Sequence, residues 1–121
     1  MKEENKGYKK LKVYEETHKL VKEIYLATSK FPNSELFGLI SQMRRCAVSV
    51  TANIIEGQAR SSKKEFKQFL YIANGSLAEL EYYLELSLDL GYITKEEFEK
   101  LDSRRMVAGS LLGGLLRYFK N

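Results

Sequence analysis

The chain has 121 residues, which suits one domain over residues 1–121 and leaves no room for a second. With 44% hydrophobic and 30% charged residues it is expected to fold rather than to stay disordered. A net charge of +4 permits an anionic partner without requiring one. One cysteine and one histidine exclude an internal disulfide and a zinc site of ordinary ligand spacing.

The beginning of the chain is polar and charged, so we expect no signal peptide and a frayed tail over residues 1–10. The longest apolar stretch, residues 106–116, contains three glycines. It has about half of the ~20 residues that a membrane-spanning helix needs. We therefore expect a cytoplasmic protein that makes no membrane contact.

Helical periodicity begins after this tail. A first helix is predicted near residues 12–31, because the residue before Pro32 is disfavoured in the α conformation. A second is predicted over 34–57, with Asn33 or Ser34 as its N-cap and Gly57 in a left-handed C-terminal turn. Apolar residues recur at steps of three or four along both helices. The stripe of the first helix consists of Val13, Thr17, Leu20, Ile24 and Phe31, and that of the second consists of Leu36, Ile40, Met43, Ala47, Val50 and Ile54.

Two capping-box patterns introduce the remaining helices. Ser62 with Glu65 begins a helix over 62–90 that ends at Gly91, and Thr94 with Glu97 begins one over 95–119. Their apolar residues are Phe66, Phe69, Leu70, Ala73, Leu77, Leu80, Leu84 and Leu88, and Phe98, Leu101, Ala108, Leu112, Leu115 and Phe119. Four amphipathic helices with short connections predict an all-α fold, an up-down-up-down antiparallel four-helix bundle.

Patterns that would indicate catalysis are missing. The sequence has no phosphate-binding loop, Rossmann glycine pattern or nucleophile elbow, and no Glu-x-x-His pair for a di-iron centre. We expect His18 on a helix surface and Cys46 in the core as a small apolar residue. The prediction is therefore a protein that is not an enzyme, with no catalytic residue, cofactor, metal or small-molecule substrate.

A polar stripe lies on the second helix within about 80° of arc, opposite the apolar one. It consists of Gln42, Arg45, Ser49, Asn53 and Glu56. A solvated face, a hydrogen-bonded contact with another helix or subunit, and a catalytic role are the three interpretations. The short side chains favour the contact, in which Arg45 or Glu56 meets an opposite charge.

A basic cluster surrounds the start of the third helix. It consists of Arg60, Lys63, Lys64 and Lys67, and Arg44 on the second helix is a further candidate. Lysines at a helix N-terminus oppose the helix dipole, so the cluster costs stability unless an anion binds there. A solvated helix start and a phosphate-binding surface for RNA or DNA are the two interpretations. We expect no base readout, because no aromatic residue is interleaved with the cluster.

Several helices carry more apolar residues than one core stripe needs. On the predicted third helix these additional residues are Tyr71, Ile72, Tyr82, Tyr83, Leu86 and Leu90. On the second they are Phe37, Val48 and Ile55, and on the fourth Leu111 and Leu116. Gly109 and Gly113 each cost about 1 kcal/mol relative to alanine, which indicates that another backbone comes close. Contiguous apolar surface of this kind predicts a homo-oligomer.

Five segments together resemble a known family. They are LKVY (residues 11–14), FP (31–32) followed by Glu35, QMRRCAVSVTANIIEG (42–57), GSLAEL (75–80) and GYI (91–93). They are similar to the bacterial four-helix-bundle proteins encoded in 23S rRNA intervening sequences, over roughly residues 8–119. The chain departs from the family at Cys46 and Ile55, where alanine is usual, and at Thr51, where proline is common.

The resemblance implies a homopentamer. It also implies kinship with the accessory protein of diversity-generating retroelements, which binds nucleic acid and a reverse transcriptase. Two functions remain open on these grounds. One is an oligomeric, weakly sequence-specific nucleic-acid-binding accessory protein, and the alternative is a scaffold that recruits a partner protein without contacting nucleic acid.

Overall fold

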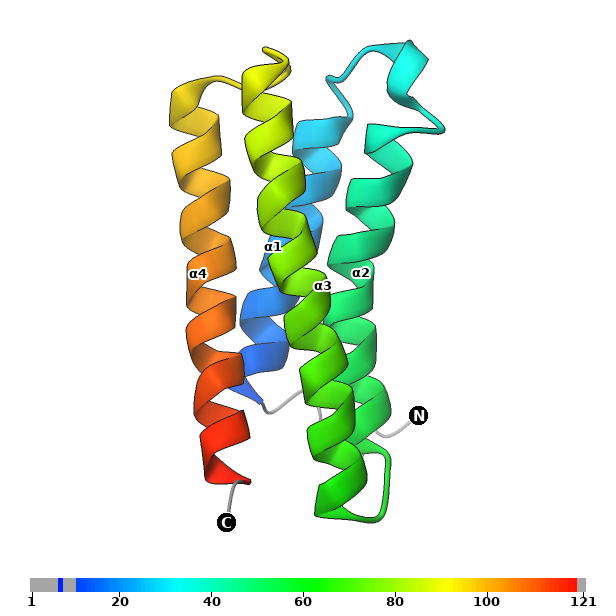
Figure 1. Ribbon diagram of the computed structural model, residues 1–121, viewed down its shortest axis with the longest axis vertical. Coiled ribbons are helices and arrows are strands. Elements are labelled where there is room, and N and C mark those ends of the chain that lie inside the picture. Colours follow the sequence, from blue (N-terminus) through cyan, green and yellow to red (C-terminus); the bar gives the residue numbers. More distant parts are fainter. Residues whose placement is uncertain (1–6, 8–10, 120–121) are drawn as a thin grey trace.

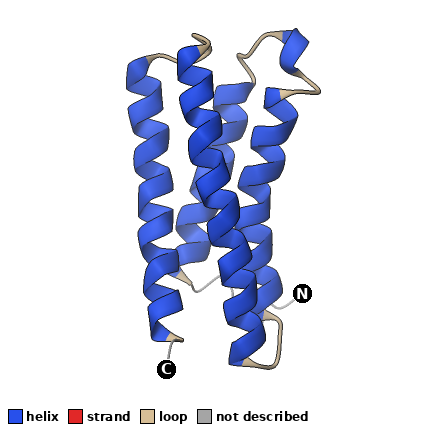
Figure 2. Ribbon diagram, viewed as in Figure 1, coloured by secondary structure: helices blue, strands red, loops and turns tan. Residues whose placement is uncertain are grey.

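The computed structural model describes residue 7 and residues 11–119. It contains α1 (Lys12–Thr28), the short 3-10 helix η3 (Asn33–Glu35), α2 (Leu39–Gln58), α3 (Lys63–Asp89) and α4 (Lys95–Tyr118). The long helices run antiparallel to their chain neighbours (Figure 1), and the described residues contain no strand (Figure 2). This confirms the predicted all-α, up-down-up-down bundle. The frayed tail expected over residues 1–10 lies outside the described residues, apart from Gly7.

The helices close into a ring in which α1 packs on α2 and α4, and α3 packs on the same two helices. Residues of the predicted apolar stripes fill the space between them, and Leu20, Ile24, Met43, Val50, Ile54, Leu70, Leu80, Leu84 and Leu112 are fully buried. Leu36 was expected in the core but is 48% exposed, because it lies in the connection before α2.

The connection between α1 and α2 corrects two expected helix ends. α1 ends at Thr28 rather than near Phe31, and α2 begins at Leu39 rather than at residue 34. The predicted caps Asn33 and Ser34 belong to η3. The Glu35 side chain instead accepts a hydrogen bond from the first backbone amide of α2. Its Oε1 accepts a hydrogen bond from the Leu39 amide at 3.0 Å, and its Oε2 accepts one from the Tyr92 hydroxyl at 2.8 Å.

Gly91 after α3 and Gly57 near the end of α2 have different roles. Gly91 has a φ of 79° and ends the helix in the left-handed conformation, as predicted. Gly57 does not form such a turn, because α2 continues through Gln58. A Cβ on Gly57 would lie 2.7 Å from Cδ1 of Phe66 and 2.8 Å from Cβ of Phe69. Glycine is therefore needed there because it lets the start of α3 pack directly on α2.

The capping boxes hold the starts of α3 and α4. Thr94 and Glu97 form both halves of the predicted box. The Ser62 hydroxyl accepts a hydrogen bond from the Glu65 amide at 3.1 Å. The second bond of a capping box, from the Ser62 amide to the Glu65 carboxylate, is not formed within the described chain. Within residue 7 and residues 11–119, no helix is long and apolar enough to cross a membrane.

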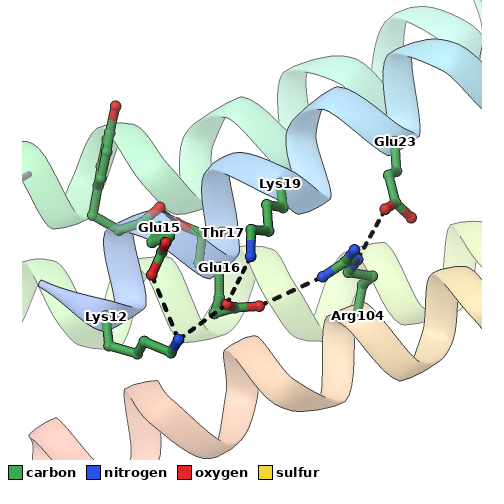
Figure 3. A network of polar contacts seen from close by, with 8 residues as sticks. Lys12, Glu15, Glu16, Thr17, Lys19, Glu23 and Arg104 are labelled. Carbon is green, nitrogen blue, oxygen red and sulfur yellow. Dashed lines mark hydrogen bonds and ion pairs between the residues drawn. The ribbon is translucent and has the colours of Figure 1, made fainter.

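Charged side chains join α1 to α4 along the outside of the core (Figure 3). Arg104 of α4 donates to Oε2 of Glu23 at 2.9 Å and pairs with Glu16 at 3.6 Å. Burial acts to raise the pKa of Glu16, but Lys19 and Lys12 outweigh it and hold that pKa below its ordinary value. The network ties two helices that are distant in sequence.

Candidate nucleic-acid interface

The first two turns of α3 place three lysines on one face. Lys63 and Lys64 lie in the first turn and Lys67 in the second, at the three- and four-residue spacings that bring helix side chains together. None of the three forms an ion pair with a residue of the described chain. The positive end of the helix dipole adds to the positive potential of these lysines, so the surface attracts anions.

These lysines border a hollow of about 720 Å³ at the end of the bundle. Its lining comes from the start of α3 and the end of α4, which lie at the same end of the molecule (Figure 1). It consists of Lys63, Lys64, Lys67, Gln68, Tyr71, Tyr118 and Phe119. The volume falls within the range of roughly 300–1,000 Å³ that is usual for ligand sites. The hollow thus combines positive charge with aromatic rings.

The aromatic wall continues from the core to the surface. Phe119 packs on Phe66 with ring centroids 5.0 Å apart and on Tyr118 with centroids 5.1 Å apart. Tyr71 is 58% exposed and Tyr118 is 74% exposed. The sequence analysis found no aromatic residue interleaved with the lysines, but the fold places Tyr71, Tyr118 and Phe119 beside them in one hollow. The absence of base readout stays a prediction. Tyr71 follows Lys67 by one helical turn and was detectable by spacing, whereas Tyr118 is brought there only by the fold.

The two arginines proposed for the same surface, Arg44 and Arg60, bind other residues. Arg60 pairs with Glu56 at 2.6 Å and lies 5.0 Å from the centre of the Phe69 ring, on the side of α2. Arg44 donates to the Thr28 hydroxyl at 2.9 Å and lies over the Tyr25 ring at 4.5 Å. Arg44 is also roughly 20 Å from the basic end, given 1.5 Å per helical residue. The structure brings together Lys63, Lys64 and Lys67, but not Arg44.

The polar stripe of α2 faces α3 at its centre. The Ser49 and Ser76 hydroxyl oxygens are 2.9 Å apart, and Asn53 Nδ2 donates to the Ser49 carbonyl at 2.8 Å and to its hydroxyl at 3.0 Å. Gln42 and Arg45 line a shallow hollow with Glu79 beside these serines. Glu56 pairs with Arg60, four residues further on and just beyond the end of α2, so this pair joins no second helix. No described residue forms an ion pair with Arg45.

Cys46 joins the same interface from the core side. Its thiol donates to the Ser76 carbonyl at 2.8 Å, and burial, with Glu79 nearby, raises its pKa to about 12. A thiol that stays protonated at neutral pH is a poor nucleophile. His18 is exposed and stacks on Tyr14 at 5.7 Å. Within the described ranges, no three His, Cys, Asp or Glu side chains are grouped so that they could hold a metal.

Comparison with known proteins relates the chain to one family. No curated protein matches it. It is similar to the crystal structure of a protein with unknown function from the S23 ribosomal protein family of Bacteroides thetaiotaomicron VPI-5482, with a TM-score of 0.77 and 27% identity. The similarity covers 86% of this chain and 97% of that chain. The family model described as 23S rRNA-intervening sequence protein matches residues 9–114, and the chain belongs to this family.

Proposed function

We propose that the protein is an oligomeric accessory protein that binds nucleic acid through the basic hollow. The observation that carries this proposal is that Lys63, Lys64 and Lys67 all line one hollow and have no ion-pair partner in the described chain. The similar structure is described as belonging to the S23 ribosomal protein family, and this description favours a nucleic-acid partner.

Phosphate contacts account for the expected binding properties. Lysine binds phosphate as a point charge and releases condensed counterions, so the affinity falls steeply as the salt concentration rises. Such contacts fix position without reading bases, so the sequence preference is expected to be weak. Repetition of the hollow around an oligomer multiplies a modest affinity of each subunit.

Fluorescence anisotropy with a labelled RNA strand tests the proposal. The triple variant Lys63→Gln, Lys64→Gln and Lys67→Gln should weaken binding roughly tenfold or more. A matched control removes three exposed lysines from other parts of the bundle, as Lys22→Gln, Lys95→Gln and Lys100→Gln. Both variants lose the same charge, so an equal effect of the two, or no binding by the unaltered protein, would refute the proposal.

Assembly is the second part of the proposal. The outward face of α3 carries Ile72 and Tyr82, which are both exposed, with Gly75 between them. A Cβ on Gly75 would meet no atom within 4 Å, so this surface is open to another subunit. Val48 is also exposed, but it follows Arg44 by one turn of α2, on the flank that faces α1, so it is separate from this surface of α3. Gly109, by contrast, faces the same bundle, because a Cβ added to it would lie 3.4 Å from Cδ2 of Leu77, so it gives no support for a contact with a second subunit.

Light scattering coupled to size exclusion tests the assembly. A homopentamer, the number that the family resemblance implies, should have about five times the 14.0 kDa mass of the chain. Gly75→Gln should reduce this mass, whereas Ser103→Gln on the exposed face of α4 should leave it unchanged. A single-chain mass for the unaltered protein at micromolar concentration would exclude the oligomer.

An apolar surface at the opposite end of the bundle favours the scaffold as a second candidate function. Phe37 is 91% exposed and Leu36 is 48% exposed in the connection between α1 and α2. Exposed apolar residues that lie together are typical of protein-binding sites. If a protein encoded next to this one binds it, and Phe37→Ser abolishes that binding while RNA has no effect, the scaffold function is supported over the nucleic-acid function.

A further inference from the structure

The exposed rings of Tyr71 and Tyr118 are not needed for the core. Phe119 touches Tyr118 edge-on, with an angle of 74° between the ring planes, so a ring face of Tyr118 stays uncovered by that contact. No described aromatic residue stacks on Tyr71. Both rings line the same hollow as the three lysines. The hollow therefore offers flat apolar surfaces beside positive charge.

We infer that the hollow binds a single-stranded segment of RNA or DNA, with unpaired bases stacked on Tyr71 and Tyr118. This inference rests on the proposed function and specifies its ligand. The phosphates on either side of the stacked bases would be bound by Lys63, Lys64 and Lys67. Aromatic platforms next to a basic groove are the usual means by which proteins hold single strands.

The arrangement disfavours a duplex as the ligand. The bases of a duplex are already stacked on one another, so they cannot cover the tyrosine rings without being unpaired. A duplex would use the lysines alone and would leave both rings exposed to water. A single strand gains stacking in addition to the phosphate contacts, and this difference should make single strands the preferred ligand.

The composition of the hollow also indicates little preference among bases. Every base has a flat face that can stack on tyrosine, so stacking does not depend on sequence. Gln68 is the one neutral amide side chain in the lining and can bond a base edge. The ring contacts from Phe66 through Phe119 to Tyr118 support Tyr118 from behind, so its position is partly fixed before binding.

An abasic strand separates stacking from phosphate binding, because it keeps the sugar-phosphate backbone and lacks the bases. Anisotropy is measured with labelled oligo(dT), an abasic strand and a duplex, each of about 16 nucleotides or base pairs. The unaltered protein should bind oligo(dT) roughly tenfold more tightly than either alternative. The double variant Tyr71→Leu and Tyr118→Leu should bind all three ligands with similar affinity. The double variant Tyr71→Phe and Tyr118→Phe should keep the preference for oligo(dT), because phenylalanine keeps the ring.

Controls separate the two proposals. Phe37→Leu removes an exposed aromatic ring at the far end of the bundle and should change no affinity. One contrary result is that the unaltered protein binds oligo(dT) and the abasic strand equally, with the lysine-to-glutamine triple variant weakening both. That result overturns the stacking inference and leaves the proposed function standing. Absence of binding to every strand overturns both. Because the chain has no tryptophan, quenching of tyrosine emission by oligo(dT) gives an independent readout of stacking.

Discussion

Ser49 of α2 and Ser76 of α3 share a hydrogen bond, with their hydroxyl oxygens 2.9 Å apart in the interface between the two helices. Asn53 donates to the Ser49 hydroxyl from one turn further along α2, and Cys46 donates to the Ser76 carbonyl. The two longest segments that resemble the family, residues 42–57 and 75–80, therefore meet at this contact. We expect the contact to help set the register of α2 against α3.

A double-mutant cycle tests that role. Ser49→Ala or Ser76→Ala alone removes the hydrogen bond between the two half-buried hydroxyls, and in Ser76→Ala the Ser49 hydroxyl keeps only the bond from Asn53. Either variant should lower the free energy of unfolding by about 0.5–1.5 kcal/mol. Removing both hydroxyls leaves neither unpaired, and alanine is the better helix former. Urea unfolding should find the double variant no less stable than either single variant. Strictly additive losses would show that the two hydroxyls do not interact.

Acid sensitivity is expected from the cap of α2. The Leu39 amide and the Tyr92 hydroxyl hold the pKa of Glu35 below its ordinary value of 4.5. A depressed pKa means that the carboxylate stabilises the fold fully above about pH 4.5 and loses this effect as the pH falls through its lower folded value. Glu35→Gln should lower the melting temperature at pH 7 and reduce its fall towards pH 3. Glu99→Gln, at an exposed position of α4, should do neither.

The corner between α2 and α3 should not tolerate a side chain at Gly57. A Cβ there would approach Phe66 and Phe69 within 2.8 Å, and the closest atom of Phe69 is its own Cβ, which cannot rotate away. Overpacking of about 1–3 kcal/mol should exceed the gain of roughly 1 kcal/mol that alanine brings to a helix. Chemical denaturation should thus show Gly57→Ala destabilised. Gly109→Ala, whose Cβ would meet only the end of Leu77 at 3.4 Å, should be neutral or stabilised.

Periodicity was sufficient to predict the helices but not their junctions. The core residues follow a spacing of three or four, and this pattern depends only on which face is buried. The start of α2 depends on Glu35, whose carboxylate reaches past Gly38 to the Leu39 amide and is held by Tyr92 from a distant part of the chain. Gly57 was misread for a similar reason. Its role is set by Phe66 and Phe69 across the corner, and a local turn rule does not include them.

The candidate interface was predicted in part. Lys63, Lys64 and Lys67 are close in sequence and share a helix face, so their grouping follows from the pattern alone. Arg60 is equally close in sequence, but its guanidinium pairs with Glu56 and lies over the Phe69 ring, and Arg60 does not line the hollow. Tyr118 lies at the end of another helix and reaches the lysines only because antiparallel packing brings the two helix ends together.

The salt dependence of RNA affinity tests the central claim most directly. Between about 50 and 200 mM salt, log K for a single strand should fall linearly with log salt, with a slope of about −0.7 for each phosphate that is neutralised. The Lys63→Gln, Lys64→Gln and Lys67→Gln variant should reduce the steepness of that slope by about 2, since three contacts are lost from each bound hollow. The Lys22→Gln, Lys95→Gln and Lys100→Gln control should keep the original slope. Identical slopes for the unaltered protein and the hollow variant would contradict the assignment of this surface to nucleic acid.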